Sequence, residues 1–158
     1  MQYQFVEYLE PEIKSEICKS ILEDLPFWFG IPESNAEYCE NVRKYRFIAV
    51  LHDNCNIGFV SIKMNSEKVH EFYVLGLLKN QHRNGIGSKL LRFIEDDLLK
   101  NGVEYLEVKT LDESRESEEY KKTRLFYLKN GFIKFDVLFN EWGENNPCLI
   151  MLKRLKRH

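Results

Sequence analysis

A strand pattern, an amphipathic helix pattern and a second strand pattern follow one another between residues 68 and 109 of the chain. The first run, "VHEFYVLGLL", and the last, "VEYLEVKTL", are rich in the apolar residues that strands favour. Between them, "GSKLLRFIEDDLLKNG" repeats apolar residues at helical spacing and closes with Asn101-Gly102, a favourable helix C-terminus. A helix that connects two strands of one sheet allows them to run parallel. This unit therefore predicts an α/β domain that contains a near-parallel strand pair.

The rest of the chain continues the alternation of strand and helix patterns. Ahead of the unit, "RFIAVLHD" and "NIGFVSIKM" predict two strands joined by a turn at residues 53–56, so that three consecutive strands form an antiparallel meander. Before them, Ser34 and Glu37 predict the N-terminal cap of a short helix. The predicted order is β-α-α-β-β-β-α-β-α-β-β, a mixed and mostly antiparallel sheet with helices on both faces. Because the sequence has no linker or repeat, we expect a single domain over residues 1–158.

Charge and cysteine content narrow the classes of protein that fit. The formal net charge is −2, so no general attraction to nucleic acid is expected. The four cysteines lie at least sixteen positions apart, a spacing that disfavours a zinc site or a disulfide framework and fits a reducing compartment. The first residues carry charges too early for a signal peptide, and no apolar run is long enough to span a bilayer. We therefore expect a cytoplasmic protein with no metal, no membrane partner and no nucleic-acid partner.

Two glycines, Gly85 and Gly87, stand at the junction between the third predicted strand of the meander and the helix that follows. Backbone N–H groups in the first turn of a helix have no partners within the helix and carry partial positive charge. Glycine leaves these groups open to an anion because it has no side chain. The pattern therefore favours a phosphate or pyrophosphate site, to which Arg83 and Lys89 would add charge. A tight turn with close helix–sheet packing explains the glycines equally well, and the local sequence leaves both interpretations open.

Neither common phosphate-binding motif fits this junction. GxxxxGK[ST] is absent, and Leu90 stands where the third glycine of GxGxxG is required. The segment "LGLLKNQHRNGIGSKLL" instead resembles the coenzyme-A-binding segment of the GNAT superfamily of acyltransferases, although His82 stands where that family has Gln or Arg. Downstream, "TRLFYLKNGF" resembles the family's Ala-x-x-Phe-Tyr-x-x-x-Gly-Phe helix, with Thr123 in place of Ala and Tyr120 where Asn is common. Together with the predicted element order, the two motifs make the chain similar to bacterial-type members of the GNAT family.

The resemblance implies a GNAT fold with acetyl-CoA as the cosubstrate. The pyrophosphate would lie on backbone N–H groups of residues 83–88, and the pantetheine arm would follow the end of the preceding strand, where Gly76 would form a bulge. A backbone N–H near Leu77 would stabilise the oxyanion that forms when an amine attacks the thioester. The coenzyme-binding residues implied in this way are Leu77, Leu78, His82, Arg83, Asn84, Gly85, Ile86, Gly87, Ser88 and Tyr127.

The resemblance also implies two catalytic side chains. Tyr127, from the Phe-Tyr pair, would return a proton to the leaving thiolate, with a purely structural core aromatic as the alternative. Glu71 lies at the offset at which histone-acetylating members carry a catalytic glutamate, and it would act as the base. A solvent-facing strand residue is one alternative for Glu71. Deprotonation through ordered water, without a dedicated base, is another.

Acceptor choice is expected in the two loops where the family varies most, "PFWFGIPES" and "NEWGENNP". Their aromatic residues, which would wall an acceptor pocket or simply cap the core, are Phe27, Trp28, Phe29 and Trp142. The resemblance thus implies an N-acetyltransferase that moves an acetyl group from acetyl-CoA to a primary amine of a small molecule or peptide, by direct attack in a ternary complex. A GNAT-fold module that binds acyl-CoA without turnover is the alternative, supported by the off-pattern His82 and Tyr120. A homodimer is left open.

Overall fold

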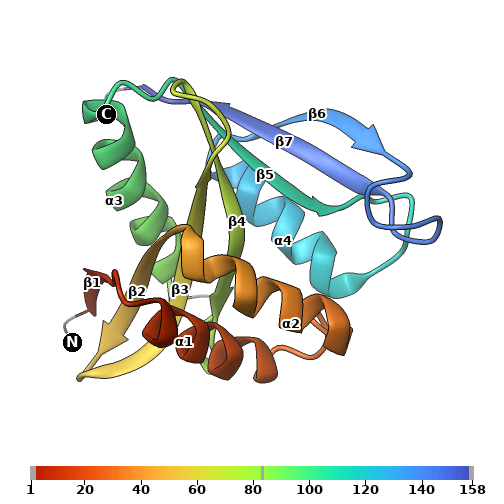
Figure 1. The fold of residues 1–158 in the computed structure, drawn as a ribbon. Helices are drawn as coiled ribbons and strands as arrows, with labels where there is room; N and C mark the ends of the chain where they lie inside the picture. Colours follow the sequence, from red (N-terminus) through yellow and green to blue (C-terminus); the bar gives the residue numbers. More distant parts are fainter. Residues whose placement is uncertain (1–2, 83, 157–158) are drawn as a thin grey trace. The chain divides into compact units, whose positions relative to one another are not determined.

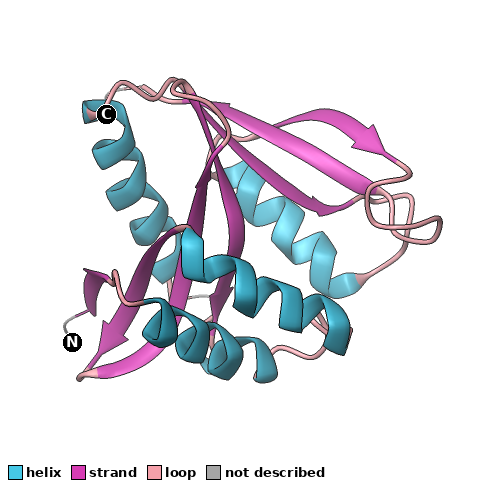
Figure 2. Cartoon of the chain, in the orientation of Figure 1, coloured by secondary structure: helices cyan, strands magenta, loops and turns pink. Residues whose placement is uncertain are grey.

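The computed structural model describes residues 3–82 and 84–156, and its helices and strands follow the predicted order (Figures 1 and 2). The strands are β1 (Tyr3–Glu7), β2 (Arg46–His52), β3 (Cys55–Met64), β4 (Val69–Leu77), β5 (Tyr105–Leu111), β6 (Ile133–Leu138) and β7 (Cys148–Arg154). The helices are α1 (Pro11–Glu23), α2 (Pro32–Asn41), α3 (Ile86–Lys100) and α4 (Glu118–Lys129), with short 3-10 segments η1 (Val42–Lys44) and η2 (Lys79–Gln81).

The sheet has the strand order β1-β2-β3-β4-β5-β7-β6. The pairs β1–β2, β2–β3, β5–β7 and β6–β7 are antiparallel, whereas β4 and β5 run parallel. The parallel register runs from Val69 opposite Tyr105 to Phe72 opposite Val108. The predictions of a mixed, mostly antiparallel sheet and of a parallel pair within residues 68–109 are therefore confirmed.

The chain forms two compact units, and β4 contributes to both. The first unit comprises the residues up to Met64 together with Tyr73–Ile94. The second comprises Asn65–Phe72 together with the residues from Glu95 onward. Each unit therefore contains a part of β4 and a part of α3.

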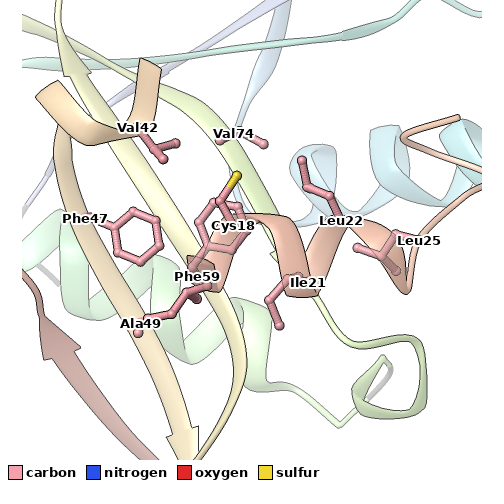
Figure 3. Packing of buried hydrophobic residues seen from close by; sticks show 10 residues of the cluster. Cys18, Ile21, Leu22, Leu25, Val42, Phe47, Ala49, Phe59 and Val74 are labelled. Atoms are coloured by element: carbon pink, nitrogen blue, oxygen red, sulfur yellow. The ribbon is translucent and has the colours of Figure 1, made fainter. Parts of the chain in front are cut away.

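The core of the first unit forms where α1 packs on β3 (Figure 3). Helix α1 buries one face that includes Cys18, Ile21 and Leu22, as its apolar spacing predicts. Two phenylalanines lie opposite this face, Phe47 on β2 and Phe59 on β3, with their rings stacked at a centroid distance of 5.0 Å. Burial of such apolar side chains is the main favourable term in folding.

Two glycines, Gly58 and Gly76, allow close approaches between elements of the first unit. A Cβ atom at Gly76 would lie 2.9 Å from Cγ2 of Ile21, which belongs to the helix that covers this part of β4. A Cβ atom at Gly58 of β3 would lie 2.8 Å from the carbonyl oxygen of Gly76. Both distances are shorter than real Cβ atoms show, so glycine fits at position 76 where α1 meets β4 and at position 58 where β3 meets the backbone of β4. The bulge predicted at Gly76 stays a prediction.

The second unit is built from β5, β7, β6 and α4, and Figure 1 shows α4 lying along these strands. The side-chain oxygen of Ser117 accepts a hydrogen bond from the backbone N–H of Tyr120 at 3.3 Å and so caps the start of α4. A buried ion pair joins Lys153 Nζ to Glu95 Oε1 at 2.6 Å. The cap supports α4, which carries Tyr127, and the ion pair joins α3 to β7.

Of the turn and helix ends predicted from local sequence, two are confirmed and one is wrong. The turn between β2 and β3 is confirmed by positive φ angles of 52° at Asp53 and 65° at Asn54, values typical of tight hairpins. Gly102, with φ 83°, follows α3 as predicted. The predicted cap at Ser34 is wrong, because α2 begins at Pro32 and leaves Ser34 inside the first turn. Proline has a fixed φ that suits the first helical position, and this preference outweighs the serine signal.

Among the described residues, no helix combines the length and the apolar character needed to cross a membrane.

Candidate active site

The loop between β4 and α3 is held by hydrogen bonds to neighbouring parts of the first unit. The backbone N–H of Leu78 donates to the carbonyl oxygen of Ile57 on β3 at 2.8 Å. The backbone N–H of Lys79 donates to Asp24 Oδ2, just after α1, at 2.7 Å. The loop therefore leaves the strand with a defined direction. It also follows that the N–H of Leu78 already has a partner within the protein.

His82 has a clear structural partner in this loop. Its Nε2 atom lies 2.8 Å from the carbonyl oxygen of Leu77, at the end of β4. The edge of its ring meets Trp28 at a centroid distance of 5.4 Å. The residue that departs from the family pattern thus ties the loop to the strand that precedes it. The adjacent candidate, Arg83, lies outside the described residues.

Gly85 and Gly87 occupy different conformational roles at the start of α3. Gly85 has φ +74°, a left-handed conformation that glycine adopts without strain. A Cβ atom there would meet nothing within 4 Å, so close packing does not explain this glycine. The backbone N–H of Lys89 donates a hydrogen bond to the carbonyl oxygen of Gly85 at 3.2 Å. The N–H groups of Ile86, Gly87 and Ser88 precede it, in the turn where helical N–H groups lack partners within the helix.

Glu71 is buried in the second unit, with a relative exposure of 5%. Its Oε1 atom accepts a hydrogen bond from Asn65 Nδ2 at 3.0 Å. The same Asn65 amide nitrogen lies 3.3 Å from Oε2 of Glu107, the residue opposite Glu71 in the parallel register. Lys109 Nζ lies 3.9 Å from Glu71 Oε2. The alternative of a solvent-facing strand residue is therefore excluded for Glu71.

The pKa values of two groups beside Glu71, Glu107 and Lys109, are raised. Burial raises the pKa of the Glu107 carboxyl, and the adjacent Glu71 raises it further, against the opposing effects of Lys109 and Asn65. Burial lowers the pKa of Lys109, but the surrounding carboxylates outweigh it, so this pKa is raised and the ammonium group stays charged. The sequence analysis did not select Asn65, Glu107 or Lys109. The alternation "LEVK" placed Glu107 and Lys109 on one strand face, but only the strand register puts them beside Glu71.

Tyr127 is buried on α4, with a relative exposure of 5%. Its ring makes edge contacts with Phe126 and Phe132 at centroid distances of 5.4 and 5.3 Å. Burial raises the pKa of the Tyr127 phenol, and nearby Tyr120 raises it further. Burial also raises the pKa of Tyr120, to about 12. Both phenols therefore keep their protons at neutral pH. Tyr127 packs as a core aromatic and keeps a protonated hydroxyl, so neither interpretation of this residue is excluded.

The aromatic residues proposed for the acceptor have different surroundings. Phe27 is 64% exposed, with Lys79 Nζ 5.4 Å from its ring centroid. Trp28 is half-buried against His82, and Phe29 is half-buried against Tyr38, at a centroid distance of 5.8 Å. Trp142 belongs to the second unit and is 36% exposed.

A chain of aromatic contacts that the sequence analysis missed continues from Phe29 and Tyr38. Tyr38 meets Tyr73 of β4 at 5.5 Å, and Tyr73 meets Tyr45 at 5.0 Å. The hydroxyl of Tyr73 accepts a hydrogen bond from Asn41 Nδ2 at 2.8 Å. Burial raises the pKa of Tyr73, so this phenol is also neutral. Only the packing of α2 against β4 brings Tyr38 and Tyr73 together, and no local sequence pattern predicts this contact.

Comparisons with known proteins agree with this arrangement. The model of the acetyltransferase (GNAT) family matches residues 15–132, which is more than half of the chain. A protein from Desulfovibrio desulfuricans described as a GNAT-family acetyltransferase superposes with a TM-score of 0.82 at 18% identity, covering 98% of this chain and 100% of that one. An aminoglycoside 6'-N-acetyltransferase complexed with coenzyme A superposes with a TM-score of 0.74 at 19% identity, covering 100% and 99%.

A third similar structure is the ribosomal-protein-S18-alanine N-acetyltransferase from Escherichia coli. Its TM-score is 0.77 at 15% identity, and the match covers 99% of this chain and 96% of that one. A search of curated proteins finds no significant match. At these identities the structures establish the fold alone, whereas the family model is matched by the sequence itself. The chain belongs to the GNAT acetyltransferase family.

Proposed function

We propose that this protein is an N-acetyltransferase that transfers an acetyl group from acetyl-CoA to a primary amine of a small molecule or peptide, and that residues 1–158 form one GNAT domain. The observation that carries the proposal is the junction between β4 and α3. There, a loop held by hydrogen bonds from Leu78 and Lys79 leads through the left-handed Gly85 into the first helical turn, whose N–H groups lack partners within the helix. Family membership gives this anion-binding geometry its expected ligand, acetyl-CoA.

In this proposal the coenzyme phosphates bind backbone N–H groups from Asn84 to Ser88. Exposed Asn84 and Gly85 leave the approach open, and the helix dipole adds partial positive charge. His82 supports the loop rather than the phosphates, because its ring nitrogen contacts the Leu77 carbonyl oxygen. The Leu78 N–H is engaged with β3, so we assign the backbone contact to the thioester oxygen to Leu77.

The proposed reaction is direct attack of the amine nitrogen on the thioester carbonyl. A carbon–nitrogen bond forms, the carbon–sulfur bond breaks and its electron pair leaves on sulfur. One proton leaves the nitrogen, for which Glu71 is the proposed acceptor, directly or through water. One proton goes to the thiolate, for which the neutral hydroxyl of Tyr127 is the proposed donor. The buried carboxylate and the buried phenol supply the two proton-transfer groups that this reaction requires.

The alternative is a module that binds acyl-CoA without turnover. It rested on two residues that depart from the family pattern. The contact between His82 and Leu77 gives the first departure a structural explanation, which leaves Tyr120 as its remaining support. The two functions differ in one measurable product, the free thiol of coenzyme A.

We expect thiol release from acetyl-CoA when the protein is given the correct amine. The panel should include aminoglycosides and peptides with an N-terminal alanine, because two of the structural neighbours act on these classes according to their names. Free thiol would be measured with a chromogenic disulfide, with amine-free and protein-free reactions as controls. Binding of acetyl-CoA by calorimetry without thiol release from any amine would favour the module.

Gly87→Glu should weaken acetyl-CoA binding by about 10²-fold or more, or about 2.7 kcal/mol, because it places a carboxylate among the proposed phosphate-binding N–H groups. The fold should persist, since an acidic residue in the first turn of a helix is favourable and glycine there is not. Calorimetry on the folded variant would measure the loss. Asn56→Glu, an equal charge change at an exposed position of β3, should bind normally. Unchanged affinity of Gly87→Glu would exclude the phosphate site.

Glu71→Gln should lower kcat by about 10²-fold or more, the scale of general base catalysis, and flatten the acidic limb of the pH–rate profile. Steady-state kinetics between pH 5 and 9 would test both effects. Glutamine keeps the size and the hydrogen-bonding capacity of the side chain, so the melting temperature should change little. A loss below about threefold would instead favour deprotonation through water without a dedicated base.

Tyr127→Phe should lower kcat by roughly tenfold to a hundredfold and leave KM for acetyl-CoA nearly unchanged, because the lost donor matters most as charge builds on sulfur. The thiol is a good leaving group, with an unperturbed pKa of about 8.5, which limits the penalty. Tyr105→Phe, at a partly exposed position of β5, serves as the matched control. An unchanged kcat with a melting temperature several degrees lower would make Tyr127 a structural residue only.

A further inference from the structure

Two carboxyl groups face each other across the parallel strands of the second unit. Glu71 and Glu107 are partners in the register of β4 and β5, so their side chains project to the same face of the sheet. Glu71 is buried and Glu107 half-buried. Asn65 Nδ2 lies within hydrogen-bonding distance of both, at 3.0 Å from Glu71 Oε1 and 3.3 Å from Glu107 Oε2. A single amide thus holds one oxygen of each carboxyl group.

One ammonium group lies beside this pair, and it is shared. Lys109 Nζ is 3.9 Å from Glu71 Oε2 and 3.6 Å from Glu141 Oε1. Both distances exceed those of a charge-assisted hydrogen bond, so Lys109 acts on the pair as a nearby charge. Two negative charges in the pair therefore face one positive charge that a third carboxylate also attracts.

Other titratable groups lie on the elements that surround the Glu71–Glu107 pair. Those on the surrounding elements are Cys148 on β7, Glu141 after β6 and Asp136 on β6, opposite Ile150 in register. Burial raises the pKa of the Cys148 thiol to about 12, so it is neutral at physiological pH. Asp136 is exposed, so water screens its charge. Glu141 is also exposed, but it lies 3.6 Å from Lys109 Nζ and acts on the pair through that ammonium group. Glu71, Glu107 and Lys109, the last shared with Glu141, are therefore the groups that set the charge at this position.

We propose that Glu71 and Glu107 act as one proton-accepting unit, in which Glu107 is a positioning residue that strengthens Glu71 as a base and Lys109 opposes this effect. Like charges held close together resist simultaneous ionisation, so the two carboxyl groups release their protons in two coupled steps. The second step leaves both groups ionised, and that form takes up a proton more readily than an isolated carboxylate does. The inference rests on the proposed role of Glu71 as base.

The proton transfer involves no other reactant. A nitrogen–hydrogen bond of the attacking amine breaks and its electron pair stays on nitrogen. The proton forms an oxygen–hydrogen bond with a carboxylate oxygen of the pair, directly or through water, and the charge of the pair changes from −2 to −1. A later deprotonation in solvent restores the ionised pair. The acidic limb of kcat/KM should therefore report the second ionisation of the pair.

Three variants separate this proposal from a purely structural role. Glu107→Gln removes the negative neighbour of Glu71, so the acidic limb should move to lower pH, and kcat at its plateau should fall by less than the roughly 10²-fold expected for Glu71→Gln. Lys109→Met removes the positive neighbour, so the limb should move to higher pH. Glu104→Gln, a control of equal charge change at an exposed position before β5, should leave the limb in place.

The proposal is overturned if the limb stays in place in Glu107→Gln, or if Glu107→Gln and Lys109→Met shift it in the same direction. A structural contact alone would change stability without these opposite shifts. Should Glu107→Gln fail to fold, the number of titration steps of the Glu71 carboxyl in the unmodified protein still decides.

A second measurement does not depend on activity. Carbon NMR of the Glu side-chain carboxyl groups, followed over pH in the protein without substrate, should show a two-step titration for Glu71 and one step in Glu107→Gln. If Glu71 titrates in one step in the unmodified protein, the inference fails even when thiol release is observed. A two-step titration without thiol release from any amine would instead support the coupled pair and count against the proposed enzyme.

Discussion

The parallel register of β4 and β5 is the constraint on which the candidate chemistry depends. It places the buried Glu71 opposite the half-buried Glu107, and two acidic groups side by side in such surroundings cost free energy unless partners compensate. Asn65 and Lys109 compensate only in part, with one shared amide and one ammonium group beyond hydrogen-bonding distance. An incompletely neutralised pair of carboxyl groups with one member buried is more typical of a functional site than of a contact selected for stability.

The junction between β4 and α3 is proposed to bind its ligand through backbone N–H groups, whereas the carboxyl pair is proposed to act through side chains. Its position is set by hydrogen bonds from Leu78 and Lys79 and by the contact between His82 and Leu77. Because these contacts hold residues 77–82, the proposed anion site would need little reorganisation of this part of the loop. A fixed loop also explains how a histidine can replace the usual Gln or Arg, since its ring supports the loop from within.

The sequence predicted what periodicity and local turn chemistry determine. The order of elements, the β2–β3 turn and the glycine after α3 follow from apolar spacing and from Asn and Gly preferences, and they are confirmed. The cap at Ser34 failed because two local signals competed and proline prevailed.

The site residues that were not predicted from the sequence were missed for a common reason. Asn65, Glu107 and Lys109 meet Glu71 only through strand register, and Tyr73 meets Tyr38 only through the packing of a distant helix. Neither strand register nor helix packing can be predicted from a local window of sequence.

The proposed acid and the proposed base differ in how burial affects them, and this difference bears on the direction of proton flow. Burial of Glu107 and repulsion from Glu71 raise the pKa of the Glu107 carboxyl and so favour its protonated state. For Tyr127, burial likewise raises the pKa, but the phenol starts from about 10 and so remains a neutral donor throughout the physiological range. The same physical effect therefore makes one group a stronger acceptor and keeps the other protonated. Enzymes that separate acid and base roles commonly do so through such paired environments. In the proposed reaction, therefore, ionisation of Tyr127 would not limit activity at mildly alkaline pH, and we expect the pH dependence to arise at the Glu71–Glu107 pair.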